Sequence, residues 1–145
     1  ILVHADLNHL LSNLGGIIIN RYFFIRLGIK SRFFYLKFIL ICSFLNFFII
    51  WVYEKILSYF FNIYPNYAAI GFSGIIYALL GFLLLTSFYG KSYFLGKKIS
   101  LKYDYEVQKI SKTICIVGLF VSFLPGISLL GHLSGFIAGS LLFFL

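Results

Sequence analysis

Five long apolar runs, separated by short polar or basic segments, constrain the fold of this 145-residue chain more than any other feature. A helix crosses roughly 30 Å of hydrocarbon with about 20 apolar residues, and three of the runs approach or reach that length. The runs are residues 7–24, 33–53, 69–89, 113 to about 124, and 131–145, the fourth ending at a Pro-Gly pair. This pattern predicts an all-α, polytopic bundle of transmembrane helices.

The composition excludes a soluble domain with the same runs packed inside it. Hydrophobic residues make up 61% of the chain and charged residues only 11%, so too few polar side chains remain to cover a core. We expect a single transmembrane domain, residues 1–145, embedded in the lipid bilayer. Because the chain starts at Ile1 and its last run reaches Leu145 without a polar flank, we also expect it to be a fragment of a longer protein.

The basic residues predict the direction of each helix. Short cytoplasmic loops accumulate Lys and Arg, and two connections carry eleven of the twelve basic residues of the chain. They are Arg21, Arg26, Lys30, Arg32 and Lys37 around the first connection and Lys91, Lys97, Lys98, Lys102, Lys109 and Lys112 in the third. We therefore expect residues 91–112 to form a basic cytoplasmic loop, and the first, third and fifth helices to begin on the outer side.

Most of the polar groups suited to chemistry lie at these outer helix ends. His4, His9 and Asn13 lie at the outer end of the first helix, Ser73 at that of the third and His132 at that of the fifth. Polar side chains are costly at membrane depth and usually face the bundle interior or a water-filled cavity, so their convergence predicts a site. A serine hydroxyl becomes a good nucleophile when a base takes its proton, and His132 is a base at the same depth. The pair indicates acyl transfer.

Small residues predict a close approach of the third and fifth helices, which the pair requires. Gly135 and Gly139 follow His132 on one stripe of the fifth helix, and Gly74 follows Ser73 on the third. The glycines on either side of Ser73 also free the turn that presents it. We therefore expect the two helix backbones to touch.

The outer ends also offer donors for an oxyanion. The N-terminus of the third helix supplies backbone N–H groups beside Ser73. His9 and Asn13 are four residues apart, so they share one face of the first helix and would complete an oxyanion hole.

Three motifs, in this order, resemble those of the rhomboid family of intramembrane serine proteases. HxxxxHxxxN is present as HADLNHLLSN, GxSG with a tyrosine four residues after the serine as GFSGIIY, and HxxGxxxG as HLSGFIAG. The resemblance spans the whole chain. It implies that the five runs are helices two to six of a rhomboid-like six-helix core, with the first helix missing.

Position by position, the resemblance implies a serine endopeptidase that cleaves peptide bonds in or near transmembrane segments of membrane proteins. Ser73 would be the nucleophile and His132 the general base of a Ser-His dyad. The Ser73 amide, His9 and Asn13 would hold the oxyanion. The active site would face the outer, non-cytoplasmic side of the membrane.

The resemblance also implies supporting roles. Tyr77 would stack on the ring of His132, and His4 would support His9 by hydrogen bonding. The motif glycines would shape the turn and the helix contact; they are Gly71, Gly74, Gly135 and Gly139. One position departs from the family pattern: Phe24, in FFIRLG, stands where many rhomboids carry an acid.

Other classes of function fit the sequence less well. A rhomboid-like pseudoprotease would bind membrane proteins for trafficking or degradation without turnover, and the presence of both dyad residues argues against it. A transporter or channel would need ionisable residues along a path through the bilayer, and the inner halves of the predicted helices have almost none. His9 and His132 lack the further ligands that a metal or haem would require, so we expect no cofactor and no metal. The basic residues follow the connections between helices, so we expect no nucleic-acid partner.

Overall fold

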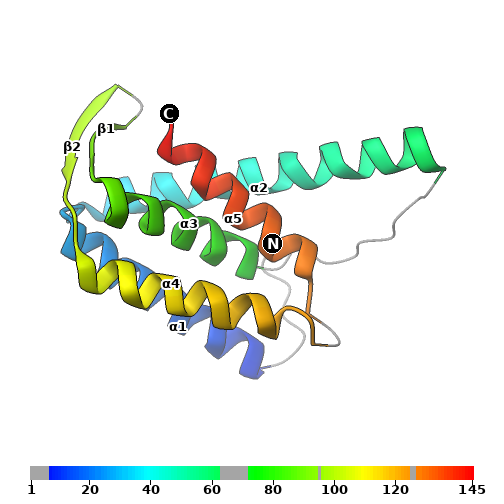
Figure 1. The fold of residues 1–145 in the computed structure, drawn as a ribbon, viewed down its shortest axis with the longest axis horizontal. Helices are drawn as coiled ribbons and strands as arrows, with labels where there is room; N and C mark the ends of the chain where they lie inside the picture. Colours follow the sequence, from blue (N-terminus) through cyan, green and yellow to red (C-terminus); the bar gives the residue numbers. More distant parts are fainter. Residues whose placement is uncertain (1–6, 63–71, 95, 125–126) are drawn as a thin grey trace.

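The structure is a computed structural model that describes residues 7–62, 72–94, 96–124 and 127–145. Within these residues it contains five helices and one β-hairpin (Figure 1). The helices are α1 (Leu7–Leu27), α2 (Arg32–Phe61), α3 (Ser73–Tyr89), α4 (Tyr105–Val121) and α5 (Leu129–Phe143), and the strands are β1 (Lys91–Phe94) and β2 (Lys97–Leu101). The all-α class predicted from the apolar runs is therefore confirmed.

Helix α3 lies at the centre of the bundle. It contacts α1, α2, α4 and α5, and Figure 1 shows it between α4 and α5. Its side chains are apolar on every face of the helix, with alanine, leucine, isoleucine and phenylalanine over most of its length. A helix that is apolar all round is buried among other helices or in a membrane. The helix that begins at Ser73 is therefore held on all sides.

An aromatic cluster fills the core near the hairpin. The rings of Phe24 and Phe82 stack with centroids 5.9 Å apart, and Phe38 meets Phe82 edge to face at 4.6 Å. Phe94 of β1 packs against both Phe38 and Phe82. These contacts join α1, α2, α3 and the hairpin at the end where α3 finishes.

Ion pairs join α1 to the start of α4 at the same end. Arg26 contacts the carboxylates of Asp104, at 2.6 Å, and Glu106. Asp104 also caps α4 by accepting from the backbone N–H groups of Glu106 and Val107, each at 3.1 Å. Aspartate is among the residues preferred at this position, which explains why α4 begins eight residues before the apolar run predicted at 113.

These contacts change the acidity of Asp104. Its burial acts to raise the pKa, but the hydrogen bonds from Arg26, Val107 and Glu106 act in the opposite direction, and the net pKa lies below the usual 3.8. Because the pKa of the folded state is lowered, the ionised carboxylate stabilises the fold above pH 3.8. That stabilisation is lost as the pH falls through the lowered pKa.

The segment expected to be a loop, 91–112, has regular structure. It contains the antiparallel β1–β2 hairpin and the first two turns of α4. Positive φ angles at Gly90 and Gly96 let the chain turn into and within the hairpin. The inward-facing side chains of Phe94 and Leu101 are buried, so the hairpin packs on the helices.

Helix α2 is longer than predicted. It continues past residue 53 to Phe61 and extends beyond the other helices in Figure 1. Of the described helices, α2 alone is both long enough and apolar enough to cross a membrane, while α3 and α5 are apolar but shorter. The crossings predicted for the other four runs therefore stay predictions.

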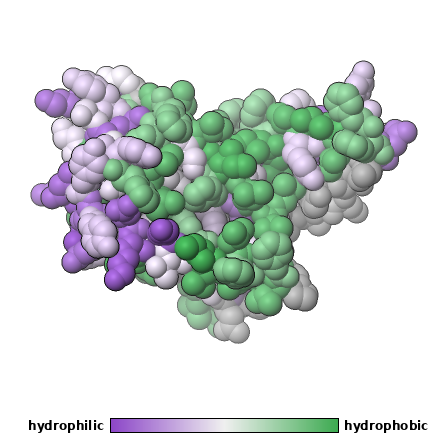
Figure 2. Space-filling view, in the orientation of Figure 1, coloured by the Kyte–Doolittle hydropathy of each residue, from purple (hydrophilic) through white to green (hydrophobic). Residues whose placement is uncertain are grey.

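The surface is apolar over most of its length. Figure 2 shows hydrophobic residues over the middle of the molecule and hydrophilic residues gathered at the end formed by β1 and β2. Large side chains such as Phe44 and Phe60 of α2 are 67% and 69% exposed. Monomeric soluble proteins rarely expose contiguous apolar areas beyond a few hundred Å², so this surface suits contact with lipid.

Candidate active site

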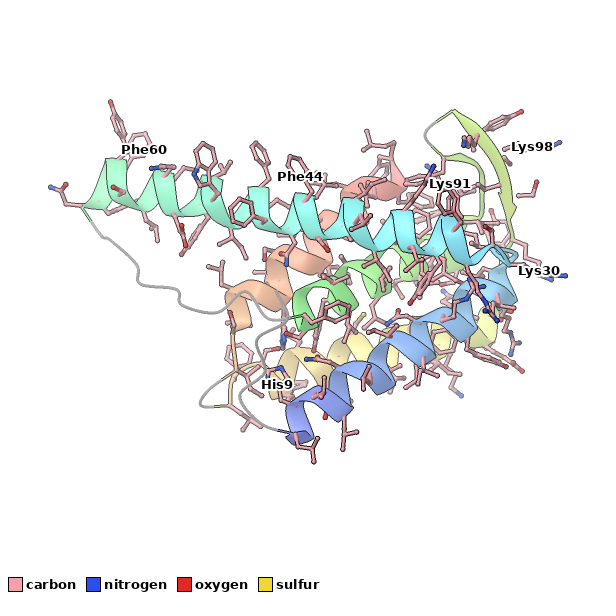
Figure 3. The ribbon with its side chains drawn as sticks, turned by 180° about the vertical axis from the view of Figure 1, so that it is seen from behind. His9, Lys30, Phe44, Phe60, Lys91 and Lys98 are labelled. Carbon is pink, nitrogen blue, oxygen red and sulfur yellow. The ribbon has the colours of Figure 1, made fainter. Side chains whose placement is uncertain are left out.

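The N-terminal ends of α1, α3 and α5 lie together at one end of the molecule. Ser73 is the first residue of α3, His132 lies in the first turn of α5, and His9 and Asn13 are in the first two turns of α1. Figure 3 shows His9 at the end opposite to Lys30, Lys91 and Lys98. Two residues implied by the motifs, His4 and Gly71, lie outside the described residues.

Backbone contact between α3 and α5 brings the serine and histidine segments together. A Cβ atom added to Gly135 would overlap the carbonyl of Gly74, and one added to Gly139 would overlap the carbonyl of Ala78. Next to Ser73 and His132, a Cβ on Gly74 would lie 3.0 Å from the carbonyl oxygen of Gly131. Only glycine permits this separation, so the small-residue stripes do place the two backbones in contact.

The ring of His132 is enclosed. Only 8% of the residue is exposed, and the ring of Tyr77 stacks on it with centroids 4.2 Å apart and planes 14° apart. Tyr77 follows Ser73 by one helical turn on the same face of α3. The hydroxyl of Ser73 is thus one turn from the residue that covers the imidazole.

The polar contacts of His132 differ from a simple dyad. Its Nδ1 lies 2.5 Å from the hydroxyl of Ser122, at the end of α4. Among the described residues no hydrogen bond joins Ser73 to His132. The structure therefore brings the two residues to neighbouring backbone positions and leaves their side chains unbonded.

Ser122 was not among the residues that the sequence indicated. It lies in VSFLPG, at the C-terminal end of the fourth apolar run, without a motif around it. The one available signal was its depth, because a serine near the end of that run lies in the same layer as the other polar groups.

Two of the predicted oxyanion donors lie in the first two turns of α1. Asn13 is 5% exposed, and its Nδ2 has no hydrogen-bond partner in the described structure. His9 is half-buried. Ser73 opens α3, where the first backbone N–H groups of a helix have no intrahelical acceptor, and Phe72 before it provides no side-chain cap.

A buried polar contact supports the α3–α5 pair from behind. The hydroxyl of Ser134 donates to Asn46 Oδ1 at 2.6 Å, and the amide nitrogen of Asn46 lies against Gly74. Asn46 and Ser134 are 1% and 2% exposed. This contact ties α2 to both helices of the site, and no pattern in the sequence indicates it.

The arrangement contains a serine hydroxyl, an imidazole and, among the described residues, a buried amide nitrogen without a hydrogen-bond partner. Among the described residues, no three His, Cys, Asp or Glu side chains converge as metal ligands would. The groups present are those of acyl transfer through a serine.

Comparison with known proteins identifies the family. The model of the Rhomboid domain matches residues 1–145. No curated protein and no solved structure matches the chain. The match covers the three motifs and all five helices, and it agrees with the resemblance seen in the sequence. The chain belongs to the rhomboid family.

Proposed function

We propose that this protein is an intramembrane serine protease that hydrolyses peptide bonds in or near the transmembrane segments of other membrane proteins. Ser73 is the nucleophile and His132 the general base. The observation that carries the proposal is the contact between α3 and α5, where Gly74 beside Ser73 meets Gly131 beside His132 and Tyr77 covers the imidazole.

The reaction follows the chemistry of these groups. The Ser73 oxygen attacks the carbonyl carbon of the substrate while its proton moves to a ring nitrogen of His132. The tetrahedral intermediate then collapses, and the leaving amine takes that proton from His132. Water, activated by the same imidazole, hydrolyses the acyl-enzyme and restores the Ser73 hydroxyl.

The charge that develops on the substrate oxygen needs donors in fixed positions. The unpaired, buried Nδ2 of Asn13 is such a donor, and the Ser73 N–H and His9 complete the set. A buried donor without a partner costs about 1–3 kcal/mol, and the intermediate removes that cost when its oxyanion pairs with the amide.

The substrate must unwind locally before cleavage. In a transmembrane helix each backbone carbonyl accepts an intrahelical hydrogen bond, so a scissile carbonyl inside a regular helix is hidden. Glycine or other helix-weakening residues near the cleavage point should therefore favour cleavage.

A pseudoprotease is the second candidate. It draws on one observation, that the Ser73 hydroxyl makes no hydrogen bond to His132 within the described residues. Catalytic hydrogen bonds are often long in the absence of substrate and shorten in the reacting complex, so the resting geometry is compatible with an enzyme.

Cleavage of a single-span substrate by the full-length protein in proteoliposomes tests the proposal. We expect the wild type to cleave it and to react with a fluorophosphonate at Ser73. Ser73→Ala and His132→Ala should each lower cleavage by about 1,000-fold or more, because the dyad acts as a unit. Folding of both variants is checked by circular dichroism.

Two results would contradict the protease assignment. One is cleavage or labelling that Ser73→Ala leaves undiminished. The other is a wild type that binds the substrate and neither cleaves it nor reacts with the probe, which is the behaviour of a pseudoprotease.

A further inference from the structure

Ser122 makes two short hydrogen bonds from a fully enclosed position. It follows the last residue of α4 and is 2% exposed. Its Oγ lies 2.6 Å from the carbonyl oxygen of Gly118, one turn earlier, and 2.5 Å from Nδ1 of His132. No part of the reaction described above uses this hydroxyl.

Ser122 also contacts the Tyr77 hydroxyl, which can either donate or accept, so the two short bonds determine which groups donate. A carbonyl oxygen only accepts, and a serine hydroxyl has a single proton, so the Ser122 proton belongs to the bond with Gly118. The Ser122 oxygen can then offer His132 only a lone pair. The Nδ1 atom of His132 must therefore carry a proton and donate it, because two acceptors at that separation would repel each other.

A neutral imidazole has one protonated and one unprotonated nitrogen. With the proton on Nδ1, the lone pair that can act as a base is on Nε2. The bond to Ser122 thus selects the tautomer of His132.

We propose that Ser122 is a positioning residue that holds the Nδ1 proton of His132 and leaves Nε2 free to receive the proton of Ser73. The catalytic part of this proposal rests on the proposed function. In a serine-protease triad a carboxylate occupies the corresponding place beside the imidazole. Here a neutral hydroxyl occupies it. Of the three described acids, Asp104 and Glu106 are bound to Arg26 at the opposite end, and Glu54 lies in α2 without a hydrogen bond or ion pair to His132.

The ring is fixed from two directions. Tyr77 stacks on its face, and Ser122 binds its Nδ1 edge. The positions of Ser122 and Tyr77 both depend on Gly118. Its carbonyl accepts a hydrogen bond from Ser122, and its missing side chain leaves room for the Tyr77 hydroxyl. A face contact and an edge bond together set the direction of Nε2.

Each proton is accounted for during acylation of Ser73. The O–H bond of Ser73 breaks and a bond from the proton to Nε2 forms as the Ser73 oxygen joins the substrate carbon. The imidazolium keeps its Nδ1–H on Ser122. When the carbon–nitrogen bond of the substrate breaks, the Nε2 proton moves to the leaving amine, and His132 returns to the same tautomer.

The first test observes the tautomer without any need for activity. Full-length protein with ¹⁵N-labelled histidine is placed in lipid bilayers at a pH where imidazole is neutral, and its nitrogen resonances are recorded. The His132 resonances are those that disappear in His132→Gln. We expect a protonated Nδ1 and an unprotonated Nε2, and in Ser122→Ala a mixture of both tautomers. A wild-type proton on Nε2, or an unchanged spectrum in Ser122→Ala, overturns the proposal.

The second test measures turnover. Loss of a hydrogen bond to a group that becomes charged should lower kcat by about 10- to 100-fold in Ser122→Ala, with KM little changed. Ser122→Thr keeps the hydroxyl and should restore most of kcat. Ser87→Ala is the matched control, because Ser87 is also 2% exposed and bonds a carbonyl of its own helix, that of Leu84, away from the site. Equal losses in Ser122→Ala and Ser87→Ala, or no loss in Ser122→Ala, contradict the role.

The two tests separate this proposal from the proposed function. If the wild type neither cleaves nor reacts with the fluorophosphonate but Nδ1 carries the proton, the protease assignment fails and the Ser122–His132 bond stands. If Ser73 is labelled and substrate is cleaved while Nε2 carries the proton, the protease stands and the role of Ser122 fails. Labelling lost in Ser122→Ala but kept in Ser73→Ala would make Ser122 the nucleophile and overturn both.

Discussion

At the residue scale, the predicted site contains a buried amide nitrogen that has no hydrogen-bond partner in the part of the chain that the structure describes. The Nδ2 atom of Asn13 has no partner, whereas Nδ2 of Asn20, two turns later in α1, donates to the carbonyl of Gly16 at 2.8 Å. The other buried polar side-chain atoms without a partner among the described residues are oxygens: Asn20 Oδ1, Thr86 Oγ1 and Ser111 Oγ. Folded proteins pair nearly all buried donors, and exceptions call for an explanation. An oxyanion that exists only during the reaction is the explanation that the proposed function offers.

The amide of Asn13 should therefore matter for turnover more than for folding. We expect Asn13→Ala to lower kcat by about 100- to 1,000-fold with little change in KM, as loss of an oxyanion donor does. Steady-state kinetics on the single-span substrate measures the effect, and thermal unfolding in detergent should show no loss of stability.

Asn20→Ala is the matched control for this variant, since it removes a bonded amide from the same helix. It should lower stability by about 1 kcal/mol and leave kcat within a few-fold of the wild type. A fall in substrate affinity equal to the fall in kcat for Asn13→Ala would count against the oxyanion role.

At the scale of elements, the contact between α3 and α5 decides whether the site exists. Gly135 and Gly139 of α5 meet the backbone carbonyls of Gly74 and Ala78, and a Cβ on Gly81 would lie 2.6 Å from the carbonyl of Phe136. Helices in lipid gain most from close van der Waals packing, which small residues allow. One added methyl group on this seam would push the two backbones apart and move Ser73 away from His132.

Two glycines can test this contact, because Gly139 lies against the backbone of α3 and Gly15 lies beside open space. Gly139→Ala should destabilise the protein by about 1–3 kcal/mol and lower cleavage sharply, because the new methyl group meets backbone that cannot rotate away. Gly15→Ala in α1 is the control, since its Cβ would meet nothing within 4 Å. It should be neutral or stabilise by up to about 1 kcal/mol.

Unfolding of both variants by heat in detergent micelles, followed by circular dichroism, provides the comparison. Similar stabilities for Gly139→Ala and Gly15→Ala would show that the α3–α5 contact is looser than the structure has it.

At the scale of the whole molecule, the two ends differ in chemistry. The end formed by the hairpin carries hydrophilic residues (Figure 2), and Lys30, Lys91 and Lys98 lie there, far from His9 (Figure 3). Lys and Arg concentrate on the cytoplasmic side of membrane proteins. We therefore propose that the hairpin faces the cytoplasm and that the site opens towards the other side.

Cysteine labelling tests this orientation in cells that express the protein without Cys42 and Cys115. A membrane-impermeant maleimide should label Asn62→Cys, at the exposed end of α2, in intact cells. It should label Lys98→Cys, in β2, only after the membrane is permeabilised, because the two positions lie at opposite ends of the bundle (Figure 1). Labelling of both cysteines in intact cells would contradict the orientation.

The positions of the helices were accessible from the sequence because they depend on local signals. Each predicted apolar run lies in or overlaps a helix, and the helix that carries GFSGIIY begins at Ser73. The boundaries were less predictable where a cap or a polar segment decided them. Asp104 starts α4 early, and α2 continues through Glu54 and Lys55 because neither residue breaks a helix.

The sequence by itself determined the helical class, the family and the motif residues, since each of these is a pattern among neighbours along the chain. Only the tertiary structure decided which side chains meet across helices. It joined Ser122 to His132 and Asn46 to Ser134, and within the described part of the chain it left the Ser73 hydroxyl without a bond to His132. The physical reason is that the rotation of each helix about its own axis follows from close packing against its neighbours, and one local sequence does not contain that information.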